Sequence, residues 1–309
     1  MVVTHGALAG APAPTGCALT IGNFDGVHRG HRALLDRVTR RAKERSLASC
    51  VLTFEPHPRE FFAAKGGGVA PARLTRLRDK LELVAAAGID RVHVARFDER
   101  FASLPAAEFV EAVLVRGLGA RWLAVGRDFR FGKARAGDAA LLEAAAARSG
   151  FGLEFVGDVA LEGERVSSSA VREALVAGDL RRAERLLGHT YTISGRVAHG
   201  RKLGRDLGFP TANIVLRRPP PLSGIHVVEV EGFGPGVASV GTRPTVNPVP
   251  RPLLEVHLLD WSGELYGRHL RVCFLEKLRD EEKYDDLGRL KEAITRDAHR
   301  AREYFARHG

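Results

Sequence analysis

The sequence predicts an α/β protein of two parts: a doubly wound parallel sheet, followed by an antiparallel barrel or sandwich closed by a terminal helix. From residue 18 to about residue 187, short apolar runs alternate with helical patterns, as in βαβ units. Beyond residue 188 the runs are short, β-rich and separated by Gly and Pro turns. A length of 309 residues is enough for two domains. We therefore predict domains at residues 1–187 and 188–309.

The composition is that of a globular protein, with 45% hydrophobic and 27% charged residues. We expect a cytoplasmic location and no membrane contact, because the sequence has neither an apolar run of spanning length nor a leader-like start. Cys17, Cys50 and Cys273 have no CxxC spacing, which indicates buried thiols in a reducing compartment. The net charge of +10 indicates polyanionic partners, either nucleic acid or phosphorylated small molecules.

The apolar runs of the first part predict its strands. They are ALTI (18–21), ASCVLTF (48–54), DRVHVARF (90–97), RWLAVG (121–126) and GLEFVGDV (152–159). Between them lie helical patterns such as TRLRDKLELVAAAG, in which Leu77, Leu81 and Val84 share a face and Gly88 ends the helix. In a doubly wound sheet, ligands bind beyond the carboxyl ends of the strands.

The stretch TIGNFDGVHRGHRALL, residues 20–35, follows the first of these strands with a glycine-rich turn and a helix start. Free N–H groups at a helix start attract anions. His28 and His31 flank Gly30 there, so both imidazoles could donate to phosphate oxygens during phosphoryl transfer. Two alternatives remain from the residues alone: structural histidines, and a metal site for which only Asp25 is a nearby partner.

Two common phosphate-binding loops are excluded. GRDFRFGK has the wrong spacing for a Walker loop and is followed by Ala134, and GxGxxG does not follow the first strand. In VSSSAVREAL, Ser168 and Ser169 could cap a helix from whose first turn Arg172 projects.

The second part predicts strands followed by a helix from Asp280 onward. The strands are YTISGRVA (191–198), TANIVL (211–216), GIHVVEVE (224–231), GVASVGT (236–242), LLEVHLLD (253–260) and HLRVCFLE (269–276). In the fifth strand Leu254 and Val256 share one face, which leaves Glu255 on the other. A carboxylate on the wet face of an antiparallel sheet is ordinarily solvated.

A possible phosphate-binding segment lies between the first and second of these strands. GRKLGRDLGFPTAN combines Lys202, Gly204 and Arg205 in a loop that suits folding over phosphates, although a surface turn is the alternative. Thr211 and Asn213 supply a hydroxyl and an amide oxygen, hard ligands that can complete a magnesium ion held by ATP phosphates.

These motifs together resemble the bacterial bifunctional riboflavin kinase/FAD synthetases. GNFDGVHRGH, LTFEPHPREFF, VGRDFRFG and VSSSAVREAL, in this order, resemble the adenylyltransferase module of that family. HGRKLGRDLGFPTANI, ASVGTRPTVN and LEVHLLDWSGELYG resemble its riboflavin kinase module, which implies a β-barrel for the second part. The resemblance implies that riboflavin is phosphorylated by ATP to FMN, and that FMN is then adenylylated by ATP to FAD with release of pyrophosphate.

The resemblance also implies site residues in the first module. His28 and His31 would stabilise the phosphates of ATP as catalytic residues. Nucleotide-binding positions would be Gly22, Asn23, Phe24, Gly30, Asp128, Ser168, Ser169 and Arg172. One departure is Ala170, which stands where many members of the family have an arginine.

In the second module the resemblance makes Glu255 the catalytic base for the ribityl hydroxyl. Thr211 and Asn213 would bind Mg²⁺ and phosphate, and Lys202, Gly204 and Arg205 would bind ATP. The expected partners are the small molecules ATP, riboflavin and FMN, with no nucleic acid. Two alternatives stay open: a nucleotidylyltransferase for another substrate whose barrel only binds, and an RNA-binding or regulatory protein, which the basic charge would suit.

Overall fold

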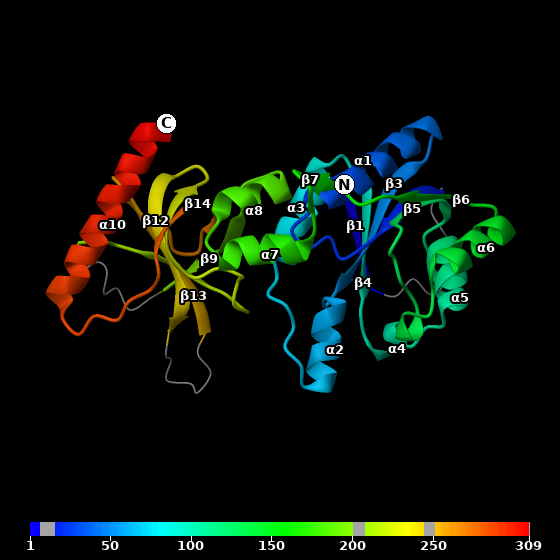
Figure 1. Cartoon of the computed structure of the whole chain (residues 1–309), viewed down its shortest axis with the longest axis horizontal. Helices are drawn as coiled ribbons and strands as arrows, with labels where there is room; N and C mark the ends of the chain where they lie inside the picture. Colours follow the sequence, from blue (N-terminus) through cyan, green and yellow to red (C-terminus); the bar gives the residue numbers. More distant parts are fainter. Residues whose placement is uncertain (7–15, 200–207, 244–250, 309) are drawn as a thin grey trace. The chain divides into compact units, whose positions relative to one another are not determined.

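The computed structural model describes residues 1–6, 16–199, 208–243 and 251–308. They form two compact units, each described here by itself (Figure 1). The first unit comprises Met1–Pro71 and Leu77–Val166, and the second comprises Ala72–Arg76 and Ser167–Gly309. The domain boundary expected after residue 187 stays a prediction. The two units are defined by packing, whereas the expected boundary separates segments that each carry one function.

The first unit contains a sheet of six parallel strands in the order β1-β4-β3-β2-β5-β6. These are β1 (Val2–Gly6), β2 (Cys17–Ile21), β3 (Ala48–Glu55), β4 (Arg91–Arg96), β5 (Ala120–Gly126) and β6 (Gly152–Val156). The predicted doubly wound sheet is confirmed. From β2 the chain order runs through β3 and β4 to one side and then continues with β5 and β6 on the other. The carboxyl end of β2 is therefore the switch point where such sheets bind ligands.

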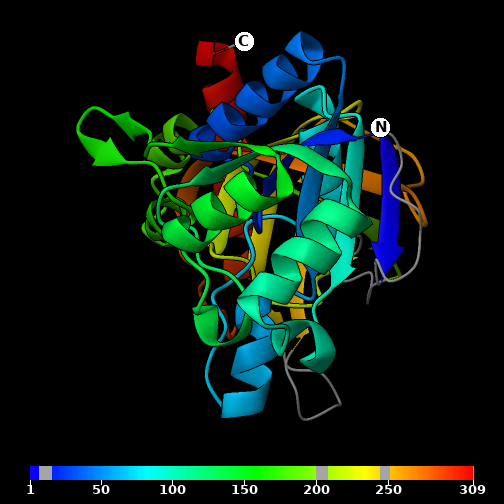
Figure 2. The ribbon, with the colours of Figure 1, turned by 90° about the vertical axis from the view of Figure 1, so that its right-hand side faces the viewer.

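Helices cover both faces of this sheet (Figures 1 and 2). They are α1 (Arg29–Glu44), α2 (Pro58–Gly66), α3 (Leu77–Ala86), α4 (Glu99–Ala102), α5 (Ala106–Glu108), a π-helix η1 (Phe109–Gly117), a 3₁₀ turn η2 (Lys133–Arg135) and α6 (Ala139–Ser149). Ala18 of β2 packs with Val38 of α1 on one face, and Leu19 packs with Leu142 of α6 on the other. A small hairpin of β7 (Ala160–Leu161) and β8 (Glu164–Arg165) follows β6.

The second unit is built on a closed barrel in the order β10-β13-β12-β11-β14-β9, as the resemblance implied. Its strands are β9 (Thr192–Ala198), β10 (Ala212–Val215), β11 (Gly224–Val230), β12 (Gly234–Arg243), β13 (Arg251–Leu258) and β14 (His269–Arg279). Its helices are α7 (Ser168–Val176), α8 (Leu180–Leu187) and the terminal α10 (Leu287–His308). None of the helices in the described part of the chain combines the length and the apolar character needed to cross a membrane.

The terminal helix begins later than predicted. We expected a helix from Asp280 onward, but residues 280–286 are not helical. Two of their side chains bind the barrel instead: Asp280 pairs with Lys277, and Glu281 accepts a hydrogen bond from Ser239. These tertiary contacts outweigh the helical preference of a short acidic segment.

Candidate active sites

The turn after β2 brings the first group of predicted residues to the switch point of the sheet. Phe24 is fully buried and takes a positive φ of 49°, which folds its ring against Gly22. A Cβ at Gly22 would lie 3.1 Å from the Phe24 ring, so glycine permits this packing. Gly30 has the same function beside His28, where a Cβ would lie 3.2 Å from Cε1 of the imidazole.

The two histidines that end this turn are stacked. Their ring centroids are 3.7 Å apart, with an angle of 17° between the planes. His28 caps α1: its Nδ1 accepts a hydrogen bond of 3.3 Å from the backbone N–H of His31. The neutral His28 ring therefore carries its proton on Nε2, as a donor for a ligand. The capping role and the ligand-binding role are compatible, because they use different nitrogens.

The surroundings of His31 disfavour its charged form. Burial, then the charge of His28, then the charge of Lys80 hold the pKa of His31 well below its usual 6.5. Its Nδ1 is buried and has no hydrogen-bond partner among the described residues. A buried N–H without a partner is costly, so the neutral ring favours a proton on Nε2 here too.

Asp128 follows β5 and binds an arginine that the sequence analysis did not identify. Nη2 of Arg165 lies 2.9 Å from Oδ2 of Asp128 and 2.9 Å from Oδ1 of Asp158. The Asp128 carboxylate raises the pKa of the Arg165 guanidinium, so this side chain is a permanent cation. Its position directly before the serine-rich motif was the only signal in the sequence.

The serine-rich motif starts α7, and its capping differs from our expectation. Ser167, and neither Ser168 nor Ser169, is the cap: its Oγ accepts a hydrogen bond of 3.2 Å from the N–H of Ala170. The prediction was wrong because α7 already begins at Ser168, so the residue before it, Ser167, takes the cap position. Arg172 donates from Nε to the carbonyl of Ala72 at 2.6 Å. The motif belongs to the second compact unit and the histidines to the first.

In the barrel, Glu255 stands on the outer face of β13. Strand register places it beside Asn213 of β10 and Ser239 of β12, while Leu254 and Val256 are buried in the barrel. Thr211 directly precedes β10, and Nδ2 of Asn213 donates to its carbonyl at 3.3 Å. This hydrogen bond uses the amide nitrogen of Asn213, so it does not occupy the amide oxygen, which is the atom that could bind a metal ion. Lys202, Gly204 and Arg205 lie outside the described residues.

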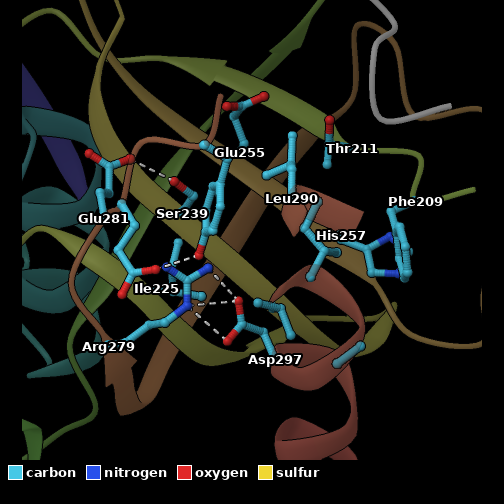
Figure 3. Close-up of a pocket in the computed structure, with 15 residues that line it drawn as sticks. Phe209, Thr211, Ile225, Ser239, Glu255, His257, Arg279, Glu281, Leu290 and Asp297 are labelled. Carbon is cyan, nitrogen blue, oxygen red and sulfur yellow. Dashed lines mark hydrogen bonds and ion pairs between the residues drawn. The ribbon is translucent and has the colours of Figure 1, made fainter. Parts of the chain in front are cut away.

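A pocket of about 260 Å³ lies between this outer face and α10 (Figure 3). Apolar side chains from β11, β12 and α10 line it, among them Ile225, Val237 and Leu290. Glu255 and Thr211 lie together toward one side of the view. The pocket therefore combines apolar side chains with a carboxylate and a hydroxyl.

A second pocket, of about 220 Å³, opens beside the first. Its lining includes Thr211, Trp261 and Tyr266, and the Tyr266 ring stacks on His199 with centroids 4.2 Å apart. Thr211 lines both pockets. A group bound in one pocket and a group bound in the other would therefore meet at this residue.

Comparison with known proteins agrees with this division into two sites. The family model for FAD synthetase matches residues 11–170, and the model for riboflavin kinase matches residues 187–305. The chain belongs to the bifunctional riboflavin kinase/FMN adenylyltransferase family. It is 52% identical over 295 residues to the Escherichia coli (strain K12) bifunctional riboflavin kinase/FMN adenylyltransferase, covering 94% of this chain and 93% of that protein.

A further relative and a solved structure are similar to almost the whole chain. The Pseudomonas fluorescens bifunctional riboflavin kinase/FMN adenylyltransferase is 50% identical over 299 residues, with coverage of 96% and 95%. A crystal structure titled macrolide-efflux protein from Streptococcus pneumoniae superimposes with a TM-score of 0.82 at 26% identity, over 98% of this chain and 99% of that one. The predicted enzyme class, a riboflavin kinase and an FMN adenylyltransferase in one chain, is confirmed.

The pocket beside α10 contains polar contacts that the sequence analysis missed. Arg279 binds Asp297 of α10 through Nε and Nη2, with a shortest distance of 2.7 Å, and Asp297 is only 4% exposed. Ser239 donates to Glu281 at 2.9 Å (Figure 3). No sequence spacing identifies these pairs, because each joins residues on different elements.

Proposed function

We propose that the two reactions of this enzyme use separate sets of side chains. The kinase reaction uses Glu255, Thr211 and Asn213 on the barrel, and the adenylyl transfer uses His28 and His31 at the turn after β2. The observation that carries the kinase half is that Thr211 lines two adjacent pockets. One pocket suits a flavin and the other a nucleotide, so the phosphoryl group would be transferred beside Thr211.

In the kinase reaction, the isoalloxazine ring of riboflavin lies in the pocket under α10, against Ile225, Val237 and Leu290. The ribityl chain extends toward Glu255, which accepts the proton of the terminal hydroxyl as this oxygen attacks the γ-phosphorus of ATP. The adenine lies in the second pocket, where Trp261 and Tyr266 offer ring faces. ADP leaves, and the new phosphate ester is FMN.

The residues beside Glu255 suit a magnesium ion carried by ATP. Thr211 supplies a hydroxyl and Asn213 an amide oxygen, and Mg²⁺ prefers such hard oxygen ligands together with substrate phosphates. Among the described residues there is no cluster of three or more His, Cys, Asp or Glu that could hold a metal ion. When bound, the ion would neutralise phosphate charge.

In the adenylyl transfer, a phosphate oxygen of FMN forms a bond to the α-phosphorus of a second ATP, and the bond from this phosphorus to the bridging oxygen breaks, releasing pyrophosphate. His28 and His31 donate from Nε2 to the phosphate oxygens on which negative charge develops. Gly22, Asn23, Phe24 and Gly30 shape the turn under the nucleotide. Asp128, which also pairs with Arg165, lies after β5 and contributes to the nucleotide site.

We further propose that Ser168, Ser169 and Arg172 bind the departing pyrophosphate at the start of α7. The hydrogen bonds of Arg172 to the carbonyls of Ala72 and Ser168 support this proposal, since they hold the guanidinium in one place at a helix N-terminus. The cytoplasm is the proposed site of action, because ATP is available there and the described thiols are free.

The test is incubation of the purified chain with riboflavin, ATP and Mg²⁺, followed by chromatography of riboflavin, FMN and FAD. The expected result is FMN first and FAD later, and a parallel sample supplied with FMN should give FAD directly. A sample in which a chelator replaces Mg²⁺ should give neither product. Formation of FAD from FMN without any FMN from riboflavin would contradict the kinase half of the proposal.

A further inference from the structure

Lys80 of α3 is a buried lysine that none of the roles above uses. Its side chain is 4% exposed, and the neighbouring Asp79 is 2% exposed. A lysine is rarely buried so completely, because its ammonium group must replace the water that it loses with protein partners. Such a position on an enzyme has a structural or a functional reason.

The contacts of Lys80 lead to the turn that carries the histidines. Its Nζ donates to Oγ1 of Thr53 on β3 at 3.3 Å, and this Oγ1 donates its own proton to the carbonyl of Asn23 at 3.3 Å. Thr53 is itself 1% exposed. An ammonium, a hydroxyl and a carbonyl thus form a buried chain of hydrogen bonds from α3, across β3, to the turn after β2.

We propose that Lys80 is a positioning residue of the FMN adenylyltransferase: through Thr53 it holds the turn that leads to His28 and His31. Each bond of the chain is polarised by the positive charge at its end, which strengthens it in a buried environment. The turn needs such support because Phe24 and Val27 take positive φ angles, which cost free energy for residues other than glycine.

The charge of Lys80 adds a second effect on the same histidines. Two stacked imidazolium rings with centroids 3.7 Å apart would repel each other, so the pair needs one neutral ring. The charged or titratable groups acting on His31 are His28 on the turn and Lys80 on α3, and both lower the pKa of His31, as burial does. Lys80 therefore favours His31 as the neutral ring of the pair. In this state His31 carries no charge and still has one N–H group that can donate a hydrogen bond.

The first test compares three variants in FAD formation from supplied FMN. Lys80→Met keeps an unbranched side chain that is one atom shorter and removes the charge, Lys80→Arg keeps a charge, and Lys43→Met makes the same change as Lys80→Met at an exposed position of α1. Lys80→Met should lower the adenylyltransferase turnover by about tenfold or more, Lys80→Arg should restore part of it, and Lys43→Met should leave it unchanged. Kinase turnover from riboflavin, measured on the same samples, should stay at the parent value, and far-ultraviolet circular dichroism with thermal unfolding of each variant checks that the first unit is folded.

The second test follows the titration of His31 without substrates, by NMR of histidine ring protons, with His31→Asn identifying the signal. The pKa of His31 should be higher in Lys80→Met than in the parent chain and in Lys43→Met. The acid limb of the pH profile for adenylyl transfer should move to higher pH in the same variant. If Lys80→Met does not fold, Lys80→Gln takes its place in both tests.

The inference rests on the proposed role of His31, and the two tests separate their failures. An unchanged His31 titration together with unchanged FAD formation in a folded Lys80→Met variant would overturn the role of Lys80. A shifted titration in Lys80→Met, together with parent-rate FAD formation in His31→Asn, would overturn the proposed role of His31 and leave the coupling to Lys80 supported.

Discussion

The histidines of the adenylyltransferase follow the end of a parallel strand, whereas the glutamate of the kinase lies in the middle of antiparallel strand β13. In the first unit helices cover both faces of the sheet, so the proposed ligand site lies beyond the carboxyl ends of the strands, at the loop of the switch point. In the second unit mostly apolar side chains fill the interior of the barrel, and the proposed ligand site is the pocket on its outer face.

The difference explains what each site needs in addition. The turn after β2 is an irregular segment and is held by buried polar contacts, as the chain from Lys80 shows. The outer face of β13 is regular, so its residues are positioned by strand pairing. An exposed strand face does not enclose a pocket by itself, so a second element has to form the opposite wall. Helix α10 supplies this wall, and the ion pair of Arg279 and Asp297 attaches the helix to the barrel.

The largest expected effect separates the two sites. Glu255→Gln keeps the shape of the side chain but cannot accept a proton, so FMN formation should fall by roughly a hundredfold or more. FAD formation from supplied FMN should stay at the parent rate. Chromatography of two samples, one given riboflavin and one given FMN, measures both. Equal FMN formation by parent and variant would show that Glu255 is only a solvated residue of a strand.

The converse experiment changes the loop. His28→Ala and His31→Ala should each lower FAD formation on the order of a hundredfold, because a donor to the developing charge is lost, while FMN accumulates from riboflavin. His28→Ala should also lower the free energy of unfolding by about 1 kcal/mol, because His28 caps α1. His5→Ala, at an exposed position, is the matched control. Parent-rate FAD formation by either variant would remove that histidine from the mechanism.

The attachment of helix α10, which lines the proposed riboflavin pocket, can be weakened without changing Glu255. Asp297→Asn leaves the Arg279 guanidinium without its buried counterion, and we expect a loss of about 3 kcal/mol in the free energy of unfolding of the barrel, with a higher KM for riboflavin. Asp260→Asn removes an exposed ion pair between Asp260 and Arg302 of α10. It should change the midpoint of urea unfolding little. Equal effects of the two substitutions would contradict the assigned role of the buried pair.

The interior of the barrel contains a pH-dependent element. His226 is fully buried in contact with Phe274, and burial lowers its pKa from 6.5 to about 4. Its contribution to stability is complete above pH 6.5 and is lost as the pH falls toward 4, because only the unfolded state then gains a proton readily. Between about pH 7.5 and about pH 5 the loss amounts to about 2 kcal/mol.

Urea unfolding of the parent chain and of His226→Gln, measured by fluorescence at both pH values, isolates this contribution. The variant should show the smaller decrease in unfolding free energy between them. Parallel decreases would mean that His226 is not the group responsible.

The smallest expected effect concerns the independence of the kinase. Fragments Ser167–Gly309 and Leu187–Gly309 should both form FMN, with turnover within about threefold of the full chain, because the barrel has its own core. The longer fragment should have the higher midpoint of thermal unfolding, since Leu180 and Leu186 of α8 are buried. A folded fragment that forms no FMN would show that the kinase depends on the preceding part of the chain.

By itself the sequence was sufficient for features that depend on neighbouring residues along the chain. Strand alternation placed Glu255 opposite to Leu254 and Val256, and the strand, glycine turn and helix start around His28 predicted an anion site at a sheet edge. The strand faces around Glu255 and the strand, turn and helix around His28 are confirmed, because periodicity and turn chemistry are local properties, whereas the anion site stays a prediction. The roles of the site residues themselves stay predictions.

Only the tertiary structure decided the features that join distant segments. Strand β1 has a mostly exposed surface and gave no apolar signal, yet it pairs with β4 along its whole length. The pairs of Arg279 with Asp297 and of Arg165 with Asp128, and the chain from Lys80 to Asn23, each join different elements. Their partners are chosen by packing in three dimensions, because the free energy of a buried charge depends on which groups the fold brings beside it, and one sequence read along its length does not contain that information.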